Sequence, residues 1–178
     1  MATGTVNITL LDPAMSIRKR SFAAASGLSA YLNPLSSNPV YDGEFLELDA
    51  SQNLARGTGN STKMAFMALD LVGQTDVQAS GKLTVAFGGE FECQTRLFTA
   101  SSIVLGSPLV VADVTVDSDT KRGLVVLPAQ IASFLEAGTD TVTLTKYTVV
   151  GYCTKAPSGG VMSFLRVPPQ IVTVTTAA

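Results

Sequence analysis

The stretch KLTVAFGGEFECQTRLF, residues 82–98, is the best guide to the fold of this chain. Apolar and polar residues alternate on both sides of a Gly-Gly pair, which is the period of half-buried β-strands. A two-residue turn at the glycines would place carboxylates opposite apolar side chains, a poor register. A three-residue loop at residues 88–90 instead sets Phe87 opposite Phe91 in a hairpin. One continuous bulged strand would keep the same facing, so Cys93 is expected to point inward in either case.

The same alternation recurs along the chain and predicts an all-β fold. In VVADVTV, residues 110–116, every second residue is apolar, and TVNITL, residues 5–10, repeats the pattern. Val172 and Val174 repeat it near the end. Clusters of Gly, Pro, Asn, Asp and Ser separate these segments. We expect a small β-barrel or sandwich, jelly-roll-like, with an extended N-terminal arm and one short helix.

One segment has the period of a helix instead. LPAQIASFLEAG, residues 127–138, carries Pro128 at a first helical position, several apolar residues on one helical face and Gly138 as a stop. We predict that this segment forms the short helix and that it covers an end or an edge of the β-structure.

The N-terminal region shows no sustained alternation. Residues 12–41 are rich in Ser, Ala, Asn and Pro, which indicates an extended arm or a long loop. We therefore divide the chain into an N-terminal strand and arm, residues 1–40, and a β-domain, residues 41–178. The alternative is that the arm folds back as ordinary strands of the same domain.

The composition excludes several classes of function. Only 15% of the 178 residues are charged, against roughly 25% in soluble domains, so small uncharged residues cover much of the surface and suit packing against neighbours. The formal net charge of −2 and the lack of a long basic run argue against nucleic acid as a partner. No apolar run approaches the ~18 residues of a membrane span, and nothing at the N-terminus marks the chain for export.

The titratable residues do not form a recognisable catalytic or metal site. The chain has no histidine, which removes the commonest general base and metal ligand. Glu44, Glu47 and Asp49 are predicted to form an exposed rim beside apolar strand residues. The aspartates of the turns are predicted to cap backbone groups, although a weak calcium site there stays open; they are Asp117, Asp119 and Asp140. We expect no cofactor, no metal and no enzymatic activity.

The stretch KYTVVGYCTKAPSGGVMSFLRV predicts a β-hairpin near the C-terminus. One strand runs over residues 146–155 and the return strand over residues 161–167, with a Pro-Ser-Gly-Gly loop between them. Cys153 could be a reactive thiol, but no base or helix N-terminus lies nearby in the sequence, so it is interpreted as part of the strand wall. Cys93 and Cys153 are expected to be free thiols, with a disulfide between adjacent strands as the alternative.

The order of these elements resembles the head decoration, or cement, proteins of tailed bacteriophages. In that family a Gly-Glu opening, a strand ending in Thr-x-x-Phe, a Gly-x-Pro-Leu turn and a late Val-Gly strand with a Gly-containing hairpin recur in this order. The resemblance covers roughly residues 41–168. The residues of this chain that match the family pattern are Gly43, Glu44, Asp49, Thr95, Phe98, Gly106, Pro108, Leu109, Val150 and Gly151. The N-terminal arm and residues 127–138 depart from the family pattern.

The resemblance implies a non-enzymatic virion protein. Such proteins are β-rich and often trimeric, and they bind the outer face of the expanded capsid at junctions between major capsid protein subunits. The implied partners are therefore the major capsid protein and further copies of this chain, and the implied location is the virion surface after synthesis in the bacterial cytoplasm. The residues expected at the capsid or subunit interface are Arg18, Lys19, Arg20, Phe22, Leu28, Tyr31 and Leu32 in the arm, and Arg166, Val167, Pro168 and Pro169 as a second patch.

Other classes of function remain as alternatives. A tail, baseplate or head-fibre component would use the same β-scaffold without catalysis. A carbohydrate-binding sandwich would need exposed aromatic platforms, yet the chain has no tryptophan and only 7% aromatic residues. An enzyme would need an acidic or thiol mechanism without histidine.

Overall fold

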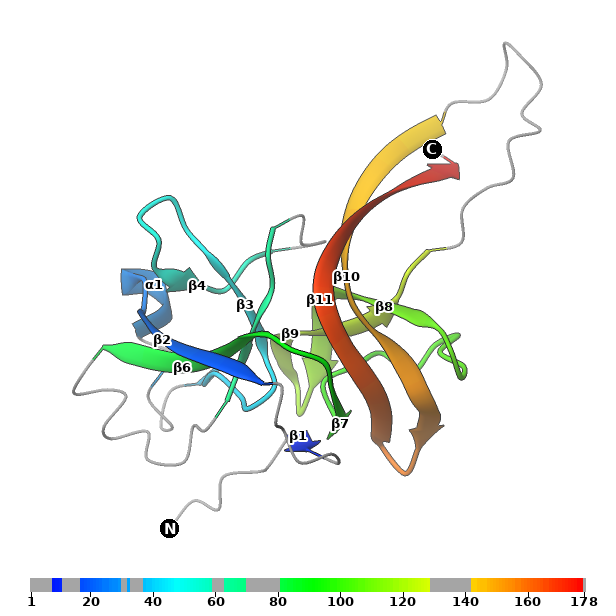
Figure 1. The fold of residues 1–178 in the computed structure, drawn as a ribbon, viewed down its shortest axis with the longest axis horizontal. Helices are drawn as coiled ribbons and strands as arrows, with labels where there is room; N and C mark the ends of the chain where they lie inside the picture. The colour runs from blue at the N-terminus through cyan, green and yellow to red at the C-terminus, as the bar shows by residue number, and fades with distance from the viewer. Residues whose placement is uncertain are drawn as a thin grey trace.

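The computed structural model confirms the all-β prediction: its described residues form two antiparallel sheets and one short helix (Figure 1). The structure describes residues 8–10, 17–29, 32, 37–58, 63–69, 81–128 and 142–177. The six-stranded sheet consists, in spatial order, of β1 (Ile8–Leu10), β7 (Phe91–Thr95), β11 (Val161–Ala177), β10 (Val142–Ser158), β8 (Pro108–Val116) and β9 (Asp119–Val126). The five-stranded sheet consists of β2 (Arg18–Ala23), β6 (Lys82–Gly88), β5 (Phe66–Ala68), β3 (Phe45–Leu48) and β4 (Leu54–Ala55).

The predicted hairpin around Gly88 and Gly89 is wrong, because β6 and β7 belong to different sheets. β6 pairs with β2 and β5, whereas β7 pairs with β1 and β11. The chain passes from one sheet to the other at a corner, where Gly89 adopts a φ of 98° that glycine tolerates best. The predicted facing survives this change, since Cys93 is fully buried. The alternation therefore predicted that Cys93 points inward, but it did not predict which strands are neighbours in the sheet.

The main core lies between the two sheets. It joins Phe45 and Met67 of the five-stranded sheet to Leu109, Val111 and other residues of the six-stranded sheet. The alternation predicted for residues 110–116 is confirmed in its outer part, where Ala112 and Val114 are buried and Asp113 and Thr115 are exposed. At the start of the stretch both faces are buried, since Val111 lies in the main core and Val110 in another cluster. Burial of the facing apolar sides of the two sheets against each other supplies the main driving force for the fold.

The five-stranded sheet is apolar on its second face as well. Leu46, Phe66 and Val85 point away from the main core and form a second cluster. The residues that cover this cluster come from the N-terminal region and include Leu28 of the helix α1 (Ser26–Ser29), Leu32 and Val40. Thus residues 18–29 fold back as a strand and a helix, which is the alternative to an extended arm. The two sheets and this cover form three layers around the main core and the second cluster. A third cluster lies on the six-stranded sheet and consists of Val110, Tyr147, Val149 and Val174.

The predicted helix at residues 127–138 lies outside the described residues from 129 onward. Leu127 and Pro128, which are described, are not helical. The short helix that the structure describes is α1, in the N-terminal region instead.

The predicted C-terminal hairpin is present and is longer than expected. β10 and β11 have 17 residues each and turn at Gly159 and Gly160, both with positive φ, as a two-residue type I′ turn requires. A bulge separates the hairpin into two halves, since Val149 pairs with Gln170 but Gly151 pairs with Arg166. The half beyond the bulge, residues 142–148 and 171–177, is called the hairpin arm below. In Figure 1 it curves away from the rest of the six-stranded sheet.

Gly123 on β9 packs too closely against its neighbours to accept a side chain. A Cβ there would lie 2.5 Å from the Leu97 carbonyl oxygen and 2.5 Å from Cγ2 of Val114. We expect Gly123→Ala to lower the free energy of unfolding by about 2–3 kcal/mol, as overpacking does, measured by urea denaturation. Gly27→Ala is the matched control, because a Cβ at Gly27 meets nothing within 4 Å. Equal stability of the two variants would contradict this packing.

Candidate functional site

The three consecutive cations of the predicted interface lie on β2, at the edge of the five-stranded sheet. Arg18, Lys19 and Arg20 are all exposed, and among the described strands β2 pairs on one side only, with β6. The guanidinium of Arg20 lies 5.0 Å from the ring centroid of Phe22, a cation–π contact. Phe22 is half-buried, with its ring 5.2 Å from that of Phe66 in an edge-to-face arrangement. β2 is thus anchored by its aromatic residue and presents its cations outward.

Two further residues of the predicted interface are buried inside the chain. Leu28 is 2% exposed and Leu32 is 4% exposed, because both cover the second face of the five-stranded sheet. The expectation that they are exposed for a partner is therefore wrong. Tyr31 lies outside the described residues.

The second predicted patch, residues 166–169, is only partly at the surface. Pro168 is exposed, and Val167 and Pro169 are half-buried. Arg166 is completely buried, so its expected exposure is wrong. Arg166 lies two residues after the buried Phe164, so the alternation predicts an inward side chain, whereas its charge predicts exposure.

Arg166 is a buried cation held mainly by backbone carbonyls. Its guanidinium donates to the carbonyl oxygens of Ala65 at 3.3 Å and Gly89 at 3.5 Å and lies 5.6 Å from the ring centroid of Phe91. Its Nε has no hydrogen-bond partner in the part of the chain that the structure describes. Burial lowers the pKa of Arg166 to about 10. Arg166 thus ties β11 to the corner at Gly89 at a cost in desolvation.

Glu44, predicted to lie on an exposed rim, is instead the centre of a buried ion network. It is 0% exposed and precedes β3. Its Oε1 accepts from Nε of Arg56 at 2.7 Å and from the backbone N–H of Arg122 at 3.2 Å. Its Oε2 accepts from Nη2 of Arg56 at 2.9 Å and from the backbone N–H of Tyr41 at 3.1 Å. The fork-to-fork pairing with Arg56 is the geometry in which a buried carboxylate is best compensated.

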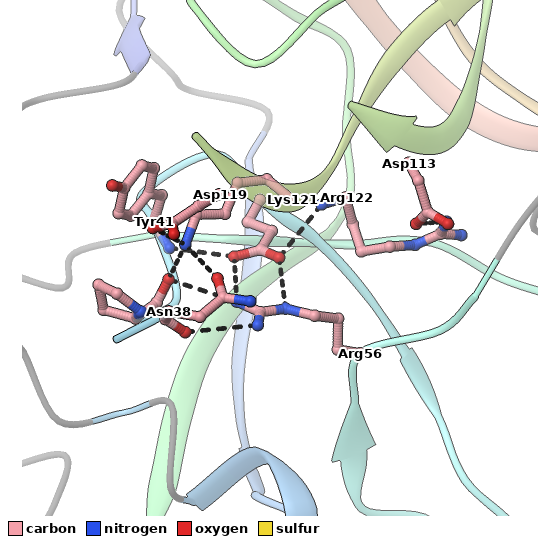
Figure 2. Close-up of polar contacts among 9 residues, drawn as sticks. Asn38, Tyr41, Arg56, Asp113, Asp119, Lys121 and Arg122 are labelled. Atoms are coloured by element: carbon pink, nitrogen blue, oxygen red, sulfur yellow. Dashed lines mark hydrogen bonds and ion pairs between the residues drawn. The ribbon is translucent and has the colours of Figure 1, made fainter. Parts of the chain in front are cut away.

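Lys121 extends this network from β9 (Figure 2). Its Nζ donates to Oδ1 of Asn38 at 2.5 Å and to the carbonyl oxygen of Pro39 at 2.6 Å. It also lies 3.3 Å from Oδ2 of Asp119 and 3.9 Å from the ring centroid of Tyr41. Burial lowers the pKa of Lys121, although the Glu44 carboxylate opposes this shift.

The network connects segments that are far apart in the sequence. Asn38 and Pro39 receive hydrogen bonds from Lys121 and, at 3.4 and 3.3 Å, from Arg56. Figure 2 shows that Asn38, Arg56 and Lys121 meet at one point. Both oxygens of Glu44 are already occupied, so neither a metal ion nor a substrate proton finds a free carboxylate there. We interpret the network as a structural anchor for the N-terminal cover.

The two cysteines are buried free thiols. Cys93 and Cys153 are 0% and 1% exposed, and burial raises the pKa of both. Both pair with Phe164, Cys93 from β7 and Cys153 from β10, so β11 separates them by about 9–10 Å of sheet. A disulfide needs Cα atoms within roughly 7 Å. The interpretation of Cys153 as a buried structural residue of its strand is therefore confirmed. The geometry does not allow a disulfide with Cys93.

Metal-binding clusters and membrane-spanning helices are both absent from the described residues. Among them, no group of three or more His, Cys, Asp or Glu side chains is placed to hold a metal ion. Within the same residues, no helix is long and apolar enough to cross a membrane. Comparison of the chain with protein-family models, curated proteins and solved structures finds no match.

Removing the charge of Glu44 should destabilise the protein strongly. In Glu44→Gln the cations Arg56 and Lys121 lose their common carboxylate, and breaking a buried pair in this way costs about 3–5 kcal/mol. The free energy of unfolding from urea denaturation measures the loss. Glu90→Gln is the matched control at an exposed position, where we expect a loss of under about 1 kcal/mol. A Glu44→Gln variant as stable as this control would contradict the anchor role.

The buried thiols should make stability fall in alkali. A folded-state pKa above the ordinary value of 9.0 means that the unfolded chain ionises first, so stability is retained below pH 9 and lost as the pH rises above it. Each thiol should contribute a slope of about 1.4 kcal/mol per pH unit. We expect Cys93→Ala to lose stability less steeply than the wild type between about pH 9 and 10.5, in denaturation at each pH. Parallel curves would show that Cys93 ionises equally in both states.

Proposed function

We propose that this protein is a decoration, or cement, protein that binds the outer surface of an expanded phage capsid at junctions between major capsid protein subunits. In this role it acts without catalysis and stabilises the shell against the pressure of the packaged DNA. The single observation that carries the proposal is β2, an edge strand on which the three consecutive cations Arg18, Lys19 and Arg20 are exposed.

An exposed edge strand offers unpaired backbone groups to a neighbouring sheet. A strand of a capsid subunit can pair with β2 by β-augmentation, while acidic side chains of that subunit meet the cations. Each contact of this kind is weak. On a shell, however, many copies and several contacts per copy act together, and later contacts form at high effective concentration.

The internal chemistry supports a structural role rather than an enzymatic one. The carboxylate of Glu44 and the ammonium of Lys121 are used in bonds within the chain. Burial keeps the thiols of Cys93 and Cys153 protonated, because it raises their pKa values, and a protonated thiol is a poor nucleophile.

The proposal is tested by separating the native source on a density gradient and quantifying this chain against the major capsid protein. We expect near-stoichiometric amounts in DNA-filled particles and absence from immature shells. A few copies per particle would contradict the proposal in favour of a tail, baseplate or head-fibre component. Recovery in the soluble fraction alone would favour a ligand-binding module.

The role of β2 is tested separately with purified expanded capsids. The triple variant Arg18→Ser, Lys19→Ser, Arg20→Ser should stay folded, because these side chains are exposed, and should bind capsids at least about tenfold more weakly.

The control is a second triple variant that removes the same amount of positive charge elsewhere on the surface. It carries Lys63→Ser, Arg96→Ser and Lys155→Ser, all at exposed positions outside β2. We expect it to bind capsids nearly as the wild type does. Equal loss of binding in both variants would assign binding to net charge and contradict the role of β2.

A further inference from the structure

The hairpin arm has two strand edges that no described strand covers. Within the body of the molecule, β8 pairs with β10 between Val149 and Tyr152, and β7 pairs with β11 between Met162 and Arg166. Beyond the bulge, residues 142–148 and 171–177 pair with each other in unbroken register, and no other described strand joins them. Open edges of this length are templates for pairing with another chain.

Pro168 and Pro169 follow the point at which the pairing of β7 with β11 ends, at Arg166. Proline has no N–H to donate to a ladder and is tolerated in sheets only at edges and bulges. Both prolines fall in the bulge between Arg166 and Gln170, where three residues of β11 face only Val150 of β10. Sheet pairing on the β11 side can therefore start again only beyond the prolines, along residues 171–177.

The two open edges differ in their protection. The β10 edge carries Lys146, which is exposed, and an exposed lysine is a common device that keeps an edge strand in solvent. The β11 edge, IVTVTTA, has no charge and no proline, and six of its seven residues are β-branched. Such a composition favours strand pairing. Ile171, at the start of this edge, is 61% exposed, a large apolar surface that a partner strand would cover.

We propose that the β11 edge of the hairpin arm, residues 171–177, pairs with the same edge of a second copy of this chain. A strand that pairs with its own copy in antiparallel orientation lies on a two-fold axis. Centred on Val174, the pairing sets Ile171 opposite Ala177 and joins two hairpin arms into one four-stranded sheet.

Self-pairing suits this edge because like charges do not meet. The same two-fold pairing of β10 edges would bring two copies of Lys146 close together, and like charges across a strand pair are destabilising. Uncharged β11 edges carry no such penalty, and the second copy offers the same unprotected strand. The contact concerns association between copies, so it goes beyond capsid binding and does not depend on it.

The contact is small, so the affinity is expected to be modest. Seven residues per strand bury less than the ~1,200 Å² of a standard interface, which places the contact in the weak class. We expect a dimer with a dissociation constant of roughly micromolar order in solution.

The experiment is analytical ultracentrifugation of the full chain from about 1 to 300 µM. Wild type should convert from monomer to dimer, and Thr173→Lys, at an exposed position of the β11 edge, should weaken dimerisation about tenfold or more by placing like charges diagonally across the axis. Thr115→Lys, at an exposed position of β8, is the matched control and should dimerise as wild type does.

A charge-reversal mixture separates pairing from misfolding. Thr173→Glu alone should dimerise as poorly as Thr173→Lys, and a 1:1 mixture of the two should recover the dimer, because opposite charges then meet across the axis. Failure of the mixture to recover it would overturn the proposal. A wild type that stays monomeric at every concentration would also overturn it. A trimer would overturn the two-fold arrangement, since a ring requires the β11 edge of one copy to meet the β10 edge of the next.

Discussion

The structure depends on a sheet that is apolar on both faces. β5 is fully buried, with Phe66 and Met67 pointing to opposite cores. A sheet of this kind needs two covers to exclude water. One cover is the six-stranded sheet, which meets it across the main core. The other is the N-terminal region with α1, so a segment without a strand-like pattern becomes part of the core.

Polar contacts, besides apolar packing, hold one end of the second cover. Asn38 and Pro39 accept hydrogen bonds from Arg56 and Lys121. The buried carboxylate of Glu44 offsets the positive charge of both side chains. Burying ions costs free energy that their attraction offsets only with well-aligned partners. The arrangement fixes one position of the cover over the sheet, whereas apolar contacts alone tolerate sliding.

Local patterns predicted the parts of the fold that local physics determines. Alternation identified the buried residues Ala112, Val114 and Cys93, and the two glycines marked the C-terminal turn, because period two and positive φ are properties of a few neighbouring residues. Pairing partners are not local. The run across Gly88 fits a hairpin as well as a corner between sheets, and only the competition between β2, β5 and β7 for the edges of β6 decides.

The candidate site was less predictable for the same reason. The three cations of β2 are exposed as their polarity suggests. Glu44 and Arg166 are ordinary charged residues in the sequence, and their burial depends on partners that are distant in the chain: Arg122 for Glu44, and the Ala65 carbonyl for Arg166. Leu28 was misplaced because the arm pattern gave no sign of the apolar face that it covers.

The bulge in β11 that contains Pro168 and Pro169 also separates the strand register of the outer half of the hairpin from that of the inner half. Val172 and Val174 pack in a third apolar cluster with Tyr147, Val149 and Val110, so a slip of one residue in the outer half would turn these valines to the opposite face. Since three residues of β11 already face one residue of β10 at this point, a shift in the outer half need not be transmitted to Phe164 and the core. The register of the outer half is therefore set by its own apolar cluster, separately from the main core around Phe164.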